Sequence, residues 1–257
     1  MRDLITVHDQ ASPASPDTAA LLDGATALGS AVVRPGRLPA KDVLSVHDGT
    51  VLAALGAATD AAHRSAALAV TAAQLVGFES RVAYAPCHAP GNRTSRTKLG
   101  DPRSLNNAAL AADALSKRGP VAVIDIDLHH GHGTQDIFRD RRTVFVGSVH
   151  GEPTTGTTAR TVALGEAAGD REYLAALTEI VRQASRFRPS AVVVSLGLDT
   201  AATDLTGRVR VTRSGLAAAG GLIAALGCPT AVIQECAGAG NASPHQLGAF
   251  LTGLLVG

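Results

Sequence analysis

The sequence predicts an α/β fold, a single-domain doubly wound parallel β-sheet with helices on both faces, and three observations support this. Apolar runs of strand length alternate along the chain with longer segments of helical periodicity. Several strand candidates are apolar throughout, which is typical of strands buried on both faces of a parallel sheet. Four of them end in polar residues, and the carboxyl ends of parallel strands share one edge, where ligands bind. No segment of the 257 residues resembles a linker, so one domain over residues 1–257 is expected.

The elements are justified in chain order. The first 42 residues are rich in Ala, Ser, Pro and Asp and predict only a short strand near 31–33. Apolar residues at helical spacing, with many alanines, predict one or two helices over 43–55 and 57–76. A loop rich in Pro, Gly, Ser and basic residues covers 86–103. The remaining strands are predicted over 81–84, 121–127, 143–148, 191–195 and 230–234, and the remaining helices over 105–117, 170–187, 212–226 and 244–255.

Composition excludes some classes of partner. The 23 basic and 22 acidic residues give a net charge of +1, so no overall field favours nucleic acid or an anionic membrane, and a small-molecule partner is expected. The three cysteines include no Cys-x-x-Cys pair, which suits a reducing compartment. The N-terminus has no signal-peptide pattern and no run of 18 apolar residues occurs, so a soluble, cytoplasmic protein is expected.

The segment VAVIDIDLHHGHGTQDIF, residues 121–138, is the most informative part of the chain. It begins as a buried strand and continues into a turn of histidines and glycines. Asp127 and His129 form a carboxylate-x-imidazole pair at the end of this strand, and Asp199 follows the strand over 191–195. These three side chains suffice for a zinc site with an open position, and they would also suit Mn²⁺ or Fe²⁺. For Asp199 alone, a helix N-cap is the alternative.

From about residue 44 to the end, the chain resembles the zinc-dependent deacetylase superfamily, which includes histone deacetylases and bacterial acetylpolyamine amidohydrolases. The resemblance is carried by DIDLHHGHGTQDIF (125–138), VGSVHGEP (146–153) and VVVSLGLDTAATDLTG (192–207), and more weakly by SLNNAALAA and VIQECAGAG. It implies an arginase/deacetylase-like fold with zinc on Asp127, His129 and Asp199. It also implies a monovalent cation, usually potassium, near Asp125 and Ser148. In the implied reaction, a metal-bound water attacks an amide carbonyl.

The chain departs from the family on the catalytic side. The family segment reads approximately RPPGHHA, and the matching stretch here is taken as AYAPCHA, in which His88 keeps the second histidine as general base and acid. Cys87 replaces the first and is either a small packing residue or a thiolate nucleophile or extra metal ligand. His132 stands where the resemblance implies a carboxylate or amide partner for the histidine.

The substrate side also departs from the family. Gly238 aligns with the tyrosine that the family directs at the substrate oxygen, and Ser104 aligns with an aromatic wall of its acyl-lysine tunnel. Arg93 and Arg96 belong to the basic loop, which is either a solvated face or a means of selecting an anionic substrate.

The first hypothesis is therefore a zinc-dependent amidohydrolase of the deacetylase type, acting on a small N-acylated amine. One alternative is changed chemistry on the same metal, such as an amide-forming or cyclising step in specialised metabolism. The other is a metal-binding homologue without turnover. The expected assembly is a monomer or a small homo-oligomer.

Overall fold

The structure is a computed structural model that describes residues 3–9, 15–76, 82–87, 90–100, 104–152, 160–205, 207–236 and 244–257. Its centre is one eight-stranded sheet in the order β2-β1-β3-β8-β7-β4-β5-β6, with every neighbouring pair parallel. The strands are β1 (Leu4–Val7), β2 (Ala31–Val33), β3 (Val82–Ala85), β4 (Val121–Asp125), β5 (Val144–His150), β6 (Thr161–Ala163), β7 (Ala191–Leu196) and β8 (Thr230–Gln234). The predicted doubly wound parallel fold is confirmed.

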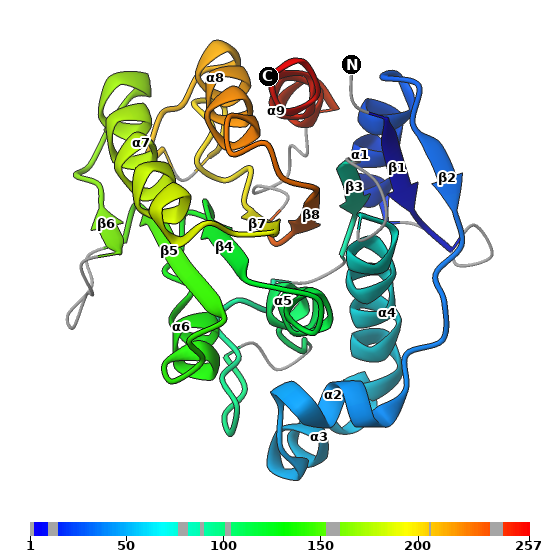
Figure 1. The fold of residues 1–257 in the computed structure, drawn as a ribbon. Coiled ribbons are helices and arrows are strands. Elements are labelled where there is room, and N and C mark those ends of the chain that lie inside the picture. Colours follow the sequence, from blue (N-terminus) through cyan, green and yellow to red (C-terminus); the bar gives the residue numbers. More distant parts are fainter. Residues whose placement is uncertain are drawn as a thin grey trace.

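Helices cover both faces of the sheet (Figure 1). In this view α7, α8 and α9 lie above it, and α4 and α5 lie below it. The helices are α1 (Pro16–Thr26), α2 (Ala40–Val46), α3 (Gly49–Leu55), α4 (Thr59–Val76), α5 (Asn107–Ser116), α6 (His132–Phe138), α7 (Asp170–Phe187), α8 (Arg213–Ala224) and α9 (Pro244–Val256), with a 3-10 turn, η1 (Gly56–Ala58). In the part of the chain that the structure describes, no helix is long and apolar enough to cross a membrane.

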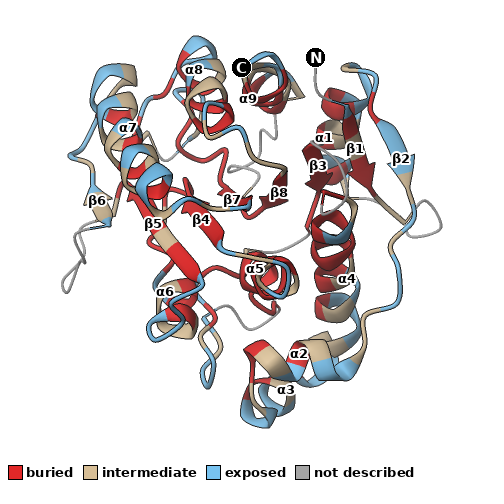
Figure 2. Ribbon diagram, viewed as in Figure 1, coloured by how far each residue is buried: buried red, intermediate tan, exposed pale blue. Residues whose placement is uncertain are grey.

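The central strands supply two separate cores because their side chains alternate between the two faces. In β7, Val192 and Val194 belong to the core beneath α1, α7, α8 and α9, whereas Val193 belongs to the core beneath α2, α3, α4 and α5. Every residue of β4, β7 and β8 is buried, as Figure 2 shows for the middle of the sheet. The apolar runs that predicted these strands are therefore explained by burial on both sides.

The predicted helix over 43–55 is interrupted in the structure. Helix α2 ends at Val46, and Asp48 then caps α3, because its Oδ1 accepts hydrogen bonds from the backbone N–H groups of Thr50 and Val51. An aspartate that binds the backbone in this way ends one helix and begins the next. Asn106 acts similarly for α5, since its side chain accepts from the N–H of Ala109.

Four elements were not predicted. They are β1, α1 and β6, together with α6, which begins at His132 where a turn was expected. β1 and β6 have four and three residues, which is too short for a clear periodicity. Helix α1 begins in the region rich in Ala, Ser and Pro, where Ser15 caps it and Pro16 occupies its first turn.

Helices α8 and α9 pack closely because glycines lie where their backbones meet. A Cβ atom on Gly253 would lie 1.9 Å from the carbonyl oxygen of Ala217, and one on Gly220 would lie 2.2 Å from that of Phe250. For Gly248, also in α9, no atom of the described residues lies within 4 Å of a Cβ placed on it. An added methyl group would therefore collide with α8 at Gly253 and would meet no neighbour among the described residues at Gly248.

We predict opposite effects for alanine at these two positions. Gly253→Ala should lower the free energy of unfolding by about 1–3 kcal/mol, because the added methyl group overpacks the contact between the helices. Gly248→Ala should raise it by up to about 1 kcal/mol, because alanine favours helix and has space there. Denaturant titration of both variants measures this difference, and equal effects would contradict the close packing of α8 against α9.

Candidate metal centre

Three predicted ligands meet at the carboxyl edge of the sheet. Asp127 and His129 follow β4, and Asp199 follows β7, the neighbouring strand. The two strands are in register up to Asp125 and Ser195, so the segments after them leave the sheet at the same level. The parallel arrangement thus brings together residues about 70 positions apart in sequence.

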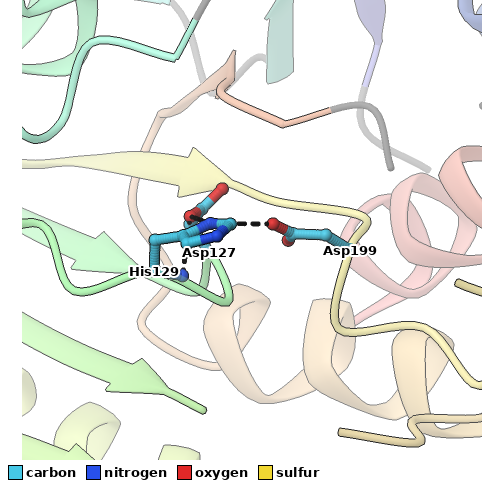
Figure 3. A group of neighbouring side chains, drawn as sticks. All are labelled: Asp127, His129 and Asp199. Carbon is cyan, nitrogen blue, oxygen red and sulfur yellow. Dashed lines mark hydrogen bonds and ion pairs between the residues drawn. The ribbon is translucent and has the colours of Figure 1, made fainter. Parts of the chain in front are cut away.

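The three side chains face one another (Figure 3). The Nδ1 atom of His129 lies 3.2 Å from Oδ1 of Asp127 and 3.1 Å from Oδ2 of Asp199. Within this trio, one potential ligand atom from each residue lies within 4.8 Å of the other two. Both carboxylates are buried, and His129 is partly exposed.

The hydrogen bonding leaves each carboxylate one oxygen for another ligand. Oδ1 of Asp127 accepts from the N–H of His129 at 2.9 Å, and Oδ1 of Asp199 accepts from the N–H of Leu128 at 3.1 Å. Among the described residues, Oδ2 of Asp127 has no hydrogen-bond partner, and Oδ2 of Asp199 has only its ion pair with His129. Buried carboxylate oxygens without donors are costly unless a cation is bound, so this set of donors fits a metal ion.

Gly197 leaves room for the two carboxylates to approach. A Cβ atom at this position would lie 2.4 Å from Oδ2 of Asp127 and 2.5 Å from Oδ1 of Asp199. Any side chain there would displace one of the two potential ligands. Glycine at 197 is therefore part of the geometry of the site.

The charges of the site favour a bound cation. Hydrogen bonds to Asp127 and Asp199 raise the pKa of His129 to about 10. Burial, together with the nearby charge of Asp127, raises the pKa of Asp199 to about 6. In the metal-free protein, a proton on His129 thus stands where a metal would bind, and a metal must displace it.

Asp125 lies beneath this trio and is fully enclosed. Its Oδ1 accepts from the N–H of Asp127 at 3.1 Å, and its Oδ2 accepts from Nδ2 of Asn92 at 3.2 Å. Burial, with the charges of Asp127 and Glu235, raises its pKa well above the usual range. Ser148 is the register partner of Asp125 on β5, and its hydroxyl lies 3.2 Å from Nδ1 of His150. The monovalent cation predicted near Asp125 and Ser148 stays a prediction.

The other predicted site residues differ in their exposure and in the groups that they contact. His132 is exposed at the start of α6, and its N–H donates to the carbonyl of His130. Ser104 is buried, with its hydroxyl bound to the carbonyl of Pro90, so it packs beneath the loop. Arg96 donates to the carbonyl of Ser45 at the end of α2, which turns it towards that helix.

Arg93 is exposed and directly follows the buried Asn92, so of the two arginines it lies nearer to the site along the chain. His88 and Gly238 lie outside the described residues, and their assigned roles stay predictions.

Cys87 is enclosed in the core at the end of β3. Its Sγ lies 3.4 Å from the carbonyl oxygen of Ser65 in α4, and it is 5% exposed. Burial raises the pKa of this thiol far above its usual value, which disfavours the thiolate that a nucleophile or a metal ligand requires. The structure therefore favours the packing interpretation of Cys87.

Comparison with known proteins identifies the family of this chain and agrees with its fold. The model of the histone deacetylase domain matches residues 47–235. This chain belongs to the histone deacetylase domain family. An acetylpolyamine amidohydrolase of Burkholderia pseudomallei is 38% identical over 195 residues, and one of Mycoplana ramosa is 34% identical over 196. Each alignment covers 68% of this chain but only 57% of the relative.

A solved structure agrees over almost the whole chain. The acetylpolyamine aminohydrolase of Burkholderia pseudomallei superposes with a TM-score of 0.88 and 26% sequence identity, covering 98% of each chain. Enzymes of the histone deacetylase family are metal-dependent, in agreement with the candidate metal group here.

Two residues near the centre were given no role from the sequence: Asn92, and Glu235, which was recognised only as a polar residue at the end of a strand. The carboxyl group of Glu235 accepts hydrogen bonds from the N–H groups of Gly91 and Asn92, and Asn92 in turn binds Asp125. The family segment RPPGHHA contains a Pro-Gly pair that could have identified Asn92, because this chain has Pro-Gly at 90–91.

Aligning the two Pro-Gly pairs places Asn92 and Arg93 at the two histidines, in place of Cys87 and His88. The structure favours this alignment, since Asn92 contacts Asp125 whereas Cys87 packs against α4.

We predict that metal binding releases a proton. Between about pH 6 and pH 10, the protonated form of His129 dominates while Asp199 is ionised, so each metal ion displaces one proton. The affinity for zinc should rise about tenfold for each pH unit in this window, because one proton is exchanged. Calorimetric titration of zinc in buffers of different ionisation enthalpy measures the number of protons released per zinc ion. A binding enthalpy that does not depend on the buffer would contradict proton release.

Cys87→Ala gives a second test of the site. If Cys87 only packs, this variant should bind zinc as the wild type does and lose about 1 kcal/mol of stability, because a small buried side chain is shortened. Zinc affinity and thermal unfolding measured side by side distinguish the cases. A large loss of zinc affinity at unchanged stability would show that the thiol is a ligand.

Proposed function

We propose that this protein is a zinc-dependent amidohydrolase of the deacetylase type that acts on a small N-acylated amine. The observation that carries the proposal is the trio of Asp127, His129 and Asp199, in which both carboxylates keep an oxygen for a cation. Membership of the histone deacetylase domain family supports it. The curated relatives are named acetylpolyamine amidohydrolases, which supports a small-molecule substrate.

Two carboxylates and one imidazole make a ligand set of the catalytic type, since three protein ligands leave a coordination position free. When bound there, a zinc ion would supply Lewis acidity, which lowers the pKa of a water molecule and polarises an amide carbonyl. In the hydrolysis, the oxygen of water bonds to the carbonyl carbon, the C–N bond breaks, and the amine leaves with a proton. Mn²⁺ and Fe²⁺ suit the same donors, so the metal itself is part of the test.

Three further roles fall to residues of the chain: holding the metal ligands, carrying the proton and selecting the substrate. The N–H groups of Leu128 and His129 hold the carboxylates, and the imidazole of His129 would bind the metal through Nδ1, the ring atom that faces both carboxylates. With Asn92 and Arg93 at the positions of the family's two histidines, neither position carries an imidazole, and we propose His88, in the preceding segment, as the proton carrier because an imidazole titrates near neutral pH. Arg93 is the exposed cation that follows Asn92, and we propose that it favours substrates carrying a carboxylate or a phosphate.

The test is hydrolysis of a panel of N-acylated amines, both cationic and anionic, after loading with zinc, manganese or iron. Asp199→Ala should lose bound zinc and reduce turnover by more than about 100-fold, since a ligand matters more than the residues that orient it. Glu179→Ala removes an exposed carboxylate of α7 and should change neither.

His88→Ala should reduce turnover while zinc binding is retained, which separates proton transfer from metal binding. Stoichiometric zinc with no turnover on the whole panel would favour a metal-binding protein without catalysis. Turnover unchanged in Asp199→Ala would remove the proposed site.

A further inference from the structure

The carboxyl group of Glu235 joins three segments of the chain inside the protein. It follows β8 and is only 2% exposed. Its Oε2 accepts hydrogen bonds from the N–H groups of Gly91, at 2.6 Å, and of Asn92, at 3.2 Å. Its Oε1 and the hydroxyl of Ser195 in β7 form a hydrogen bond of 2.8 Å. One side chain thus fixes the loop after Pro90 to the two central strands.

Asn92 carries this connection towards the metal centre. It is fully buried, and its Nδ2 donates to Oδ2 of Asp125 at 3.2 Å. The other oxygen of Asp125 accepts from the N–H of Asp127, which is one of the three proposed ligands. The hydrogen bonds therefore run without a break from Glu235 through Asn92 and Asp125 to Asp127.

The space around Asp125 leaves little room for a second arrangement. A Cβ atom on Gly131 would lie 1.9 Å from Oδ2 of Asp125 and 3.4 Å from Cβ of Asn92. The carbonyl of Asn92 accepts from the N–H of Thr134, which fixes the loop to α6 as well. The backbone of Asn92 is therefore fixed at its N–H group by Glu235 and at its carbonyl by Thr134, while its side chain contacts Asp125.

We propose that Glu235 is a positioning residue of the metal centre, acting through Asn92 and Asp125 to hold Asp127 in its metal-binding position. This inference rests on the proposed metal site. Without the carboxyl group, the N–H groups of Gly91 and Asn92 would be buried without an acceptor. The loop would then shift to satisfy them and withdraw the Asn92 amide from Asp125. Groups that orient metal ligands in this way influence metal affinity although they do not touch the ion.

The chain offers a conservative replacement at this position. Burial raises the pKa of Glu235 to about 8, so in the metal-free protein the carboxyl group is largely neutral at pH 7. Glutamine is also neutral and has the same shape. Its oxygen can accept from both N–H groups, while its Nε2 donates to the hydroxyl of Ser195. Glu235→Gln should therefore keep the connection that Glu235→Ala removes.

Gln234 provides a matched control one residue earlier. It is equally buried, and its amide binds the hydroxyl of Tyr84 and the carbonyls of Leu196 and Cys236. None of these groups belongs to the connection from Glu235 to Asp127. Gln234→Ala should destabilise the protein without affecting the metal site.

The experiment is a competition titration of zinc against a chromophoric chelator at pH 7, with thermal unfolding measured in parallel. Glu235→Ala and Asn92→Ala should each weaken zinc binding by about 10- to 100-fold, the range known for residues that orient metal ligands. Glu235→Gln should stay within about fivefold of the wild type, and Gln234→Ala within about threefold despite its lower stability. Asn92→Ala carries the test if Glu235→Ala does not fold.

The double variant Glu235→Ala/Asn92→Ala shows whether the two residues act in series. If Glu235 acts through Asn92, the double variant should bind zinc no more weakly than the weaker single variant, whereas independent effects would add. Unchanged zinc affinity in both single variants, or an equal loss in Gln234→Ala, would overturn the inference alone. A wild-type protein that binds no zinc would overturn the proposed function as well.

Discussion

The centre of this protein depends on the burial of two carboxylates opposite one imidazole. Asp127 and Asp199 are both removed from solvent; among the described residues, Oδ2 of Asp127 has no hydrogen-bond partner and Oδ2 of Asp199 has only its ion pair with His129. Such an arrangement is stable only with positive charge between them, either a proton on His129 or a metal ion. The surrounding structure keeps the two charges together, since Gly197 leaves space for them and backbone N–H groups hold their other oxygens.

The parallel sheet makes this arrangement possible. Strands β4 and β7 are neighbours in register, and each is apolar up to the point where its ligand segment begins. The apolar residues fix the strands from both faces, so the polar residues after them have little freedom in where they lie. The rigidity of the site thus comes from the core beneath it as well as from the hydrogen bonds around it.

Much of this could be predicted from the sequence, and the exceptions have physical reasons. The central strands are apolar runs that end in polar residues, and the Asp-x-His pair lies directly after one of them, so both the sheet and the trio could be predicted. β1 and β6 are too short to show a period, and the break between α2 and α3 depends on the side chain of Asp48. Glu235 and Gly91 are 144 residues apart, and their contact arises only when β8 lies beside β3. No local pattern reports such a contact.

In the loop that contains Asn92, the residues proposed to influence metal affinity and the residue proposed to select the substrate are different ones. Its buried residues are held by Glu235, Asp125 and the carbonyl and hydroxyl groups beneath them, while Arg93 extends into solvent from the next position. Under the proposed function, the side chain at position 93 could therefore change without disturbing the hydrogen bonds that orient the proposed metal ligands. Substrate selectivity and metal affinity would then be adjustable one at a time, from neighbouring residues of a single loop.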